Sequence, residues 1–335
     1  MNHVISLLFV LLGCVVLALF PFGAEALGQT AASSLVARIM IYAIAAASLN
    51  LILGYGGMVS FGHAAFFGIG SYVVGILYFH HAEETMLFGF IPGSDQFLIT
   101  VPAAMLVAGL AALVIGALAL RTSGVQFIMI TLAFAQMLFF LFVSLKTYGG
   151  EDGIIVRRAN DLFGLSLRDK TTMYYVILVS MILYFAFLWR VVHSSYGAVL
   201  SGIRQSERRM TAMGIETYRY KLYGFVLAGM GAGLAGALLT IFMRFASPDT
   251  LHWTKSGELM VMVILGGVGT FFGPIWGAAA FLILQTYLAS WTEHWQLAMG
   301  IILLVVVLGT KGGIVGGWRA LCRPFRKDRK VEVPA

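Results

Sequence analysis

Residues 193–221, HSSYGAVLSGIRQSERRMTAMGIETYRYK, form a polar and basic stretch between two long apolar segments. Helical spacing predicts that Ile203, Met210 and Met213 share one face of a short amphipathic helix. Polar side chains flank that face: Arg204, Arg208 and Thr211. Gly214 is typical of a helix C-terminus. Such a helix can lie on anionic lipid or dock into a soluble partner, and both alternatives stay open.

Four polar side chains fall within apolar segments and are the candidates for contact with a solute: Asn50, His63, Thr131 and Gln136. Polar groups at such depth are costly and tend to face the interior of a helix bundle. We predict that a translocation path runs near these residues. The alternative for each is an interhelical hydrogen bond.

The sequence contains no recognisable catalytic or metal-binding constellation. It lacks a GxxxxGK[ST] phosphate-binding loop, an HExxH motif and a nucleophile elbow. Cys14 and Cys322 lie far apart in the chain and form no ligand cluster. We predict that the chain is not an enzyme, binds no metal and holds no cofactor of its own.

Composition indicates a membrane protein. Hydrophobic residues make up 60% of the 335 residues and charged residues only 11%, whereas an ordinary soluble domain has about 25% charged residues. The mean hydropathy is +0.90. The apolar runs are long and do not alternate as barrel strands do. The predicted fold class is an all-α membrane protein, a polytopic helical bundle.

About nine or ten membrane segments are predicted, because most apolar runs approach the roughly 20 residues that cross a bilayer. The runs are 4–22, 35–53, 58–79, 97–120, 124–145, 173–192, 222–243, 258–289 and 296–310. The run 258–289 is too long for one crossing and is interrupted by GGVGTFFGP at 266–274. It is predicted to form two broken helices or a re-entrant pair.

Lysine and arginine predict the orientation. They are concentrated in 193–221 and in a basic tail at 319–335, which are therefore predicted to be cytoplasmic. Loops 23–34 and 81–96 contain neither residue and are predicted to lie outside, and the count of spans puts 146–172 outside as well. The net charge of +7 is assigned to the inner loops rather than to nucleic-acid binding, since no basic stripe contains interleaved aromatics.

The N-terminal run is predicted to be retained as a first helix, with cleavage near residue 26 as the alternative. Glycines recur at a spacing that permits close helix packing: Gly229 and Gly233, then Gly269, Gly273 and Gly277. Small residues at this spacing let helix backbones approach closely in lipid. Packing within the chain is predicted, and a dimer interface is the alternative.

Five blocks, in order along the chain, resemble the branched-chain amino acid ABC transporter permease family, in particular its LivM-like half. They are LNLILGYGGMVSFGHAAFFGIGSY (49–72), RTSGVQFIMITLAFAQM (121–137), GGEDGI (149–154), IRQSERRMTAMGIETYRYKLYGFVLAGMGAGLAGAL (203–238) and VILGGVGTFFGPIWGA (263–278). The match extends over most of the chain, but the tail at 319–335 has no such support.

The resemblance implies a permease subunit of an ATP-driven importer in the bacterial inner membrane, which moves branched-chain or related amino acids by alternating access. The implied partners are a second homologous permease, two cytoplasmic ATPases that bind the ATP, and a periplasmic binding protein. Residues 1–318 would form the permease domain, with 319–335 as a cytoplasmic tail. The substrate stays open among leucine, isoleucine, valine, urea, amides and aromatic acids.

The resemblance also implies that a coupling helix within 201–214 docks in a groove of the ATPase. The implied coupling residues are Ile203, Arg204, Glu207, Arg208, Arg209, Met210, Met213 and Gly214. The apolar ones would fill the groove, and Glu207 with the neighbouring arginines would set the register by charge pairing. Two other classes stay open, an ion-coupled secondary transporter of small polar solutes and a non-transporting membrane scaffold.

Overall fold

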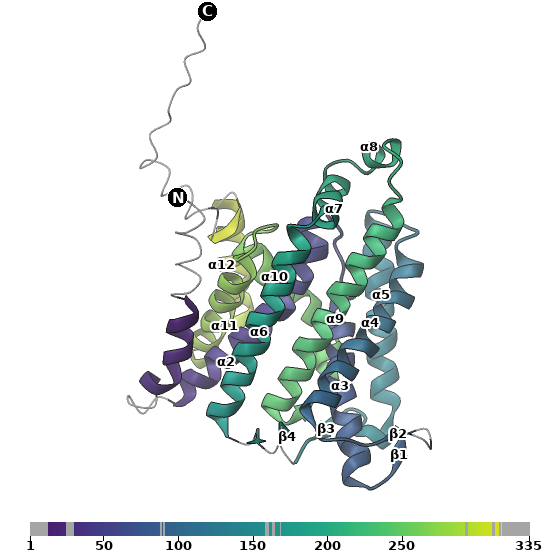
Figure 1. Ribbon diagram of the computed structural model, residues 1–335. Coiled ribbons are helices and arrows are strands. Elements are labelled where there is room, and N and C mark those ends of the chain that lie inside the picture. The colour runs from purple at the N-terminus through teal and green to yellow at the C-terminus, as the bar shows by residue number, and fades with distance from the viewer. Residues whose placement is uncertain are drawn as a thin grey trace, which may run out of the picture.

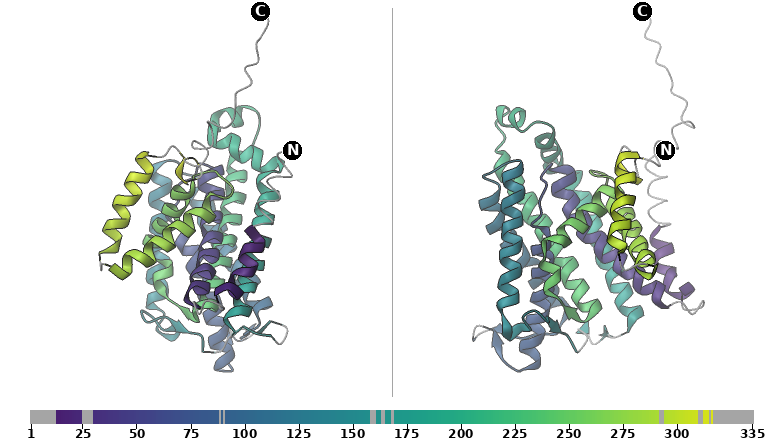
Figure 2. Two further views of the ribbon diagram at one scale, coloured as in Figure 1. Left: turned by 90° about the vertical axis from the view of Figure 1, so that its left-hand side faces the viewer. Right: turned by 180° about the vertical axis from the view of Figure 1, so that it is seen from behind.

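The computed structural model describes residues 13–24, 30–87, 89, 91–157, 161–162, 165–167, 169–291, 294–309, 312–314 and 316. Its long helices run side by side in one bundle, as Figures 1 and 2 show. The predicted class, an all-α polytopic membrane protein, is confirmed. The predicted tail at 319–335 and residues 1–12 of the N-terminal region lie outside the described residues.

Among the described residues, six helices are long and apolar enough to cross a membrane: α2 (Thr30–Asn50) with its continuation η1, α3 (His63–Ala82), α4 (Phe97–Ala119), α5 (Val125–Ser144), α6 (Lys170–Val192) and α9 (Thr217–Met243). Other helices accompany them: Gly13–Ala24, α10 (Trp253–Gly266), α11 (Gly273–Trp291) and α12 (Trp295–Gly309). The helices overlap the predicted runs, but one end lies about five residues from the predicted one at 35–53, 58–79 and 222–243. The start of the run 4–22 lies outside the described residues, and the run 258–289 is divided between two helices. The element η1 (Leu51–Tyr55) is a π-helix, a rare form that often occurs at functional sites.

Two short helices, α7 (Ser195–Gln205) and α8 (Glu207–Ala212), lie together at one end of the bundle (Figure 1). In the part of the chain that the structure describes, three antiparallel strand pairs accompany the bundle: β1 (Met86–Leu87) with β2 (Ile91–Pro92), β3 (Ile154–Ile155) with β6 (Phe245–Ala246), and β4 (Asp161–Leu162) with β5 (Leu165–Ser166). The labelled strands lie at the end opposite α7 and α8 (Figure 1). The loops 81–96 and 146–169 thus share one end, as the alternation of spans predicts.

The most buried of the long helices are α2, α3 and α9, and small residues allow α9 to approach α3 and α4 closely. At the crossing of α3 and α9, a Cβ on Gly70 would lie 2.6 Å from the Cα of Gly233 and would collide with its carbonyl oxygen. Gly229 and Gly233 face alanines of α4 (Ala108 and Ala112). These two glycines therefore pack within the chain.

The predicted run 258–289 is divided as the sequence predicts, but the first helix begins earlier. The helix α10 has 14 residues, about 21 Å of helix, which is less than the roughly 30 Å of a bilayer core. Its first turn is inside the bundle, because Ser256 is fully buried and its hydroxyl accepts a hydrogen bond from the backbone N–H of Ala64 at 2.8 Å. The helices α10 and α11 pack tightly, and a Cβ on Gly277 would lie 2.9 Å from Gly266 N.

The outer faces of α4, α5 and α6 carry exposed large apolar side chains. Examples are Leu106, Leu110, Val114, Met129, Phe140 and Leu183. Lipid or an apolar protein surface can cover such faces without cost, whereas water cannot. Among the six long helices α5 is the least buried within the chain, so α5 is the one most available to a neighbour.

Candidate functional site

The predicted single helix at 201–214 is two helices in the structure. Ser206 ends α7 and begins α8 with an extended backbone, and its hydroxyl oxygen accepts a hydrogen bond from the N–H of Arg209 at 3.4 Å. The side-chain bond satisfies one of the free N–H groups of the new helix, as an N-cap does. The regular spacing of apolar residues predicts one helix, but Ile203 lies in α7 and Met210 lies in α8.

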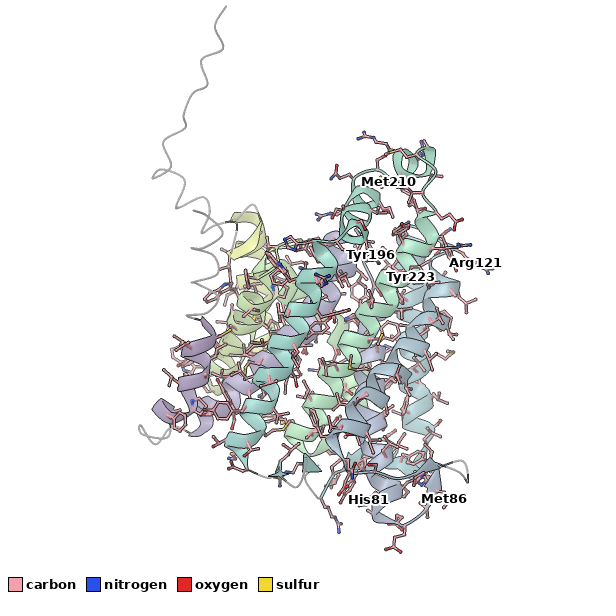
Figure 3. The ribbon with its side chains drawn as sticks, viewed as in Figure 1. His81, Met86, Arg121, Tyr196, Met210 and Tyr223 are labelled. Carbon is pink, nitrogen blue, oxygen red and sulfur yellow. The ribbon has the colours of Figure 1, made fainter. Side chains whose placement is uncertain are left out.

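The apolar residues of this segment have different surroundings. Ile203 is 4% exposed and packs into the chain, whereas Met213 is 69% exposed. Met210 is half-buried, and its sulfur lies over Gly202. Ile203 therefore cannot fill a partner's groove as predicted. Met213 is the most exposed of the three and is available for contact with a partner. Figure 3 shows Met210 at the far end of the molecule from Met86.

Gly214 ends α8 as the sequence predicts. Its φ is +82°, a conformation that favours glycine. Its N–H donates to Thr211 O at 2.9 Å, and the N–H of Ile215 donates to Met210 O at 3.2 Å. This pair of bonds is a Schellman motif, which satisfies the last carbonyl groups of a helix. The turn directs the chain back into α9.

Charged side chains tie α8 to the start of α9. The Glu207 carboxylate lies 2.6 Å from Lys221 Nζ and accepts a hydrogen bond from the Thr217 hydroxyl at 3.1 Å. Nearby, the Tyr196 hydroxyl donates to Tyr220 O at 2.8 Å, and burial raises the pKa of Tyr196. Glu207 is thus engaged within the chain, whereas the side chains of Arg208 and Arg209 are exposed.

Arg204 connects α7 to the end of α2. Its Nη1 donates to the carbonyl oxygen of Gly54 in η1, and its aliphatic stem packs over Gly57, whose φ is +69°. The guanidinium also lies against Gly269, where a Cβ would be 2.8 Å from Nη1. Arg204 is exposed as well as bonded to another part of its own chain, so its predicted contact with an ATPase stays a prediction.

Asn50 completes the same contact region. It is 2% exposed, its Nδ2 donates to Thr270 O at 2.9 Å, and its Oδ1 accepts from Gly269 N at 3.0 Å. Both partners lie in the turn between α10 and α11. We call the group Asn50, Gly54, Gly57, Arg204, Gly269 and Thr270 the junction. It joins α2, η1, α7 and the α10–α11 turn.

Two other predicted path residues are fully buried and bonded within the chain. The Nε2 of His63 lies 2.7 Å from the hydroxyl of Ser48, and this bond joins α3 to α2. The hydroxyl of Thr131 accepts from Phe61 N at 3.3 Å and donates to Ile128 O at 2.9 Å. These residues and Asn50 therefore bond to other parts of the chain, His63 to a helix, and Asn50 and Thr131 to segments between helices.

Gln136 differs from these three because it is partly exposed. Its Nε2 lies 3.5 Å from Nε2 of His252, the N-cap of α10. The His252 ring lies 5.0 Å from the ring of Phe139, and Trp253 is 39% exposed. Gln136 therefore belongs to a polar and aromatic patch between α5 and the N-terminal end of α10, the helix that is too short to cross a bilayer.

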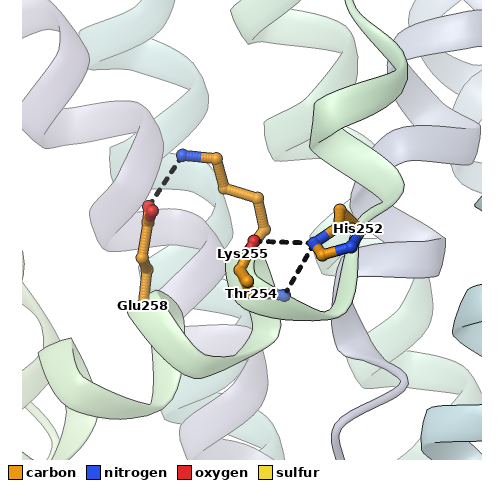
Figure 4. A network of polar contacts seen from close by, with 4 residues as sticks. All are labelled: His252, Thr254, Lys255 and Glu258. Carbon is orange, nitrogen blue, oxygen red and sulfur yellow. Dashed lines mark hydrogen bonds and ion pairs between the residues drawn. The ribbon is translucent and has the colours of Figure 1, made fainter.

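Beside this patch, α10 carries an ion pair. Lys255 Nζ lies 2.7 Å from Glu258 Oε2, and about a quarter of each side chain is exposed. Figure 4 shows the pair together with His252 and Thr254, which lie in the same first turn of α10 as Lys255. The described residues contain no group of His, Cys, Asp and Glu that could hold a metal ion.

The sequence profile of a family described as "Branched-chain amino acid transport system / permease component" matches residues 31–308. The chain belongs to this family. The match includes the six long helices, α7 and α8, the junction, and the half-helix α10.

Relatives of this family have low identity over long stretches. The high-affinity branched-chain amino acid transport system permease protein LivM of Salmonella typhimurium is 24% identical over 300 residues, 82% of this chain and 68% of its own. The probable branched-chain amino acid transport permease protein LivM of Methanocaldococcus jannaschii is 24% identical over 78% of this chain and 82% of its own. The ribose import permease protein RbsC of Bacillus subtilis is 30% identical over 39% of this chain and 43% of its own. No solved structure matches.

Several residues of this site are not predicted by the sequence of this permease. Gly54 and Thr270 take part in the junction through their backbone, so their side chains do not reveal the role. The carbonyl oxygen of Gly54 accepts from Arg204, and its backbone approaches Gly269 closely; the carbonyl oxygen of Thr270 accepts from Asn50. His252, Lys255 and Glu258 lie at or before the start of the apolar run at 258. The half-helix that contains them begins in a polar stretch, so hydropathy did not reveal it. Gly269 was expected to pack helices, but it lies in the α10–α11 turn with a φ of +77°.

Proposed function

We propose that this chain is a membrane-spanning permease subunit of an ATP-driven ABC importer for branched-chain or related amino acids. The observation that carries the proposal is the α7–α8 pair, which presents Met213, Arg208 and Arg209 outward and is bonded inward to the junction through Arg204. A surface with an exposed apolar anchor and adjacent charges suits docking to a protein partner. The permease itself performs no covalent chemistry.

The proposed partners follow from this arrangement and from the family. Two cytoplasmic ATPases bind the ATP, and one of them receives α8 in a groove. A second homologous permease covers the least buried helix of this chain, α5. A periplasmic binding protein delivers the solute to the end with the strand pairs. The end with α7 and α8 is thus cytoplasmic, in the inner membrane of a bacterium.

Coupling is proposed to run through the junction. Closure of the ATPase dimer displaces α8 and α7 together, because Met210 of α8 packs over Gly202 of α7. Glu207 ties α8 to α9, and Arg204 ties α7 to η1. Asn50 then carries the displacement to the α10–α11 turn. Since α10 is only a half-helix, its movement can open the bundle toward one side or the other. The alternation of access results from this movement.

The translocation path is proposed to run along the face of α5 and α10. Gln136 and His252 supply polar groups there, and Trp253 and Phe139 supply aromatic ones. Polar residues at membrane depth commonly mark solute pathways. The fully buried Asn50, His63 and Thr131 are proposed to hold helices together instead.

A cysteine crosslink tests the docking. Met213→Cys, in a chain with Cys14→Ser and Cys322→Ser, is expected to form a disulfide with a single cysteine placed in the ATPase groove, because Met213 is 69% exposed on α8. Met86→Cys is the matched control, since Met86 is 62% exposed at the opposite end. Crosslinking of Met86 in place of Met213, in the intact complex, would reverse the proposed orientation.

A further inference from the structure

We propose that a groove between α4, α6 and α9 binds an anionic phospholipid, with an acyl chain in the groove and the headgroup at Arg190 and Tyr223. The groove lies apart from the junction and from the proposed translocation path. The choice of the cytoplasmic leaflet rests on the proposed orientation of the chain, whereas lipid binding itself requires neither ATP nor transport.

The groove has a volume of about 370 Å³ and a mostly apolar lining. Its lining residues include Met105 of α4, Leu183, Tyr184 and Phe187 of α6, and Met230 and Leu234 of α9. Tyr184 and Leu234 are buried and form its floor. Leu183 is 66% exposed and Phe187 is 47% exposed, so the groove opens to the outside of the bundle. The space exists because α6 packs against α2 and has few contacts with α9.

The groove lies at the depth of a lipid tail. Its α6 residues run from Ser180 to Phe187, and α6 ends at Val192. With a rise of 1.5 Å per residue, the groove extends from about 8 to about 18 Å from that end of α6. Half of the hydrocarbon core of a bilayer is about 15 Å thick. An acyl chain of the leaflet on the side of α7 and α8 therefore reaches the groove.

The same end of the groove presents a cation and a hydroxyl group. Arg190 lies two turns beyond Leu183 on nearly the same face of α6, and Tyr223 lies one turn before Leu227 on the face of α9 that lines the groove. Both side chains are exposed, and the described residues give Arg190 no ion pair. Figure 3 shows Tyr223 at the same end of the bundle as Tyr196. An arginine binds a phosphate through parallel N–H donors, and tyrosine is typical of the membrane interface.

The shape and the charge of the groove favour a lipid over a transmembrane helix of a partner. A helix with its side chains is about 10 Å across, too wide for a groove of this volume between two helices. The cytoplasmic ends of membrane helices also carry an excess of lysine and arginine, which would repel Arg190. A phospholipid instead offers a narrow, flexible chain and a negative headgroup.

A bound lipid would connect α6 to α9 along a stretch where these helices have few contacts. Only His193 and Ser194 separate α6 from α7, and α7 carries Arg204 to the junction. Lipid in the groove would therefore steady α7 relative to α9.

The test uses the assembled complex in phosphatidylcholine vesicles with a trace of photoreactive lipid. The lipid carries a diazirine in one acyl chain and has either a phosphatidylglycerol or a phosphatidylcholine headgroup. Mass spectrometry maps the crosslinks to the peptides of α6 and α9. We expect the groove residues to be labelled about fivefold more by the phosphatidylglycerol probe, which is the contribution of one arginine near an anionic surface.

Two pairs of variants separate the headgroup contact from the acyl-chain contact. Arg190→Gln is expected to remove the preference for phosphatidylglycerol, and Arg190→Lys is expected to keep it because the charge remains. Ser180→Phe adds bulk inside the groove and should reduce labelling by both probes severalfold. Its control is Ile182→Phe, since Ile182 is exposed on α6 but does not line the groove; this variant should be labelled as the wild type is.

Equal labelling of the wild type by both probes would mean that only unselected bilayer lipid covers the groove, and would overturn the proposal. A preference that persists in Arg190→Gln would overturn the role of Arg190. Labelling of the isolated chain but not of the complex would show that a partner protein covers the groove, which also overturns the proposal. All of these measurements are made without ATP, so failure of the proposed transport function would leave their outcome unchanged.

Discussion

Arg204→Met is expected to reduce ATP-driven uptake at least tenfold while the ATPase remains bound. Methionine keeps an unbranched stem over Gly57 but cannot donate to Gly54 O. A carbonyl left without its donor costs about 1–3 kcal/mol, and the link from α7 to η1 is lost. Movement of α7 would then no longer reach the α10–α11 turn. ATP hydrolysis and uptake, measured on the same proteoliposomes, would show hydrolysis without matching transport.

Arg121→Met is the matched control for this experiment. Arg121 is exposed in the α4–α5 turn at the same end of the bundle (Figure 3), and the described residues give it no ion pair. It should transport as the wild type does. Wild-type uptake by Arg204→Met would show that the junction does not carry the coupling.

Gly70→Val is expected to abolish the folded permease. A side chain at this position would collide with the backbone of Gly233 and force α3 away from α9 at the centre of the bundle. Overpacking of a tight core typically costs about 1–3 kcal/mol, and here the cost is higher because the neighbour is backbone that cannot rotate away. The amount of monodisperse protein after detergent extraction, and its melting temperature, measure the effect.

Gly300→Val provides the comparison for Gly70→Val. Gly300 lies in α12, and a Cβ there would meet no atom within 4 Å. It should be extracted in wild-type amounts, because the added methyl groups would face open space. Equal recovery of both variants would mean that the α3–α9 crossing is looser than the structure has it.

The fold was largely predictable, because a helix that crosses lipid needs a run of about 20 apolar residues, which is visible in the sequence. Runs such as 97–120 and 124–145 correspond to α4 and α5 nearly residue for residue. The interruption at 266–274 was visible because several glycines and a proline occur within an apolar run. The break at Ser206 was missed, since a serine followed by a glutamate is a weak signal beside a regular apolar spacing.

The site was less predictable, because it depends on which way side chains face. Asn50 and Gln136 look alike in the sequence, yet Asn50 bonds the α10–α11 turn and Gln136 is partly exposed. Lys255 lies in a half-helix too short and too polar at its start for hydropathy to detect. Such residues emerge only when the helices are placed together.

We propose that this chain transports solute as part of an ATP-driven complex. The most direct test is uptake of leucine, isoleucine and valine by proteoliposomes that contain the chain, a second permease, both ATPases and the binding protein. Uptake is expected to require ATP hydrolysis and to be unaffected by ionophores. Uptake that persists with inactive ATPases and collapses with an ionophore would contradict the proposal, as would no uptake by a complex verified as intact.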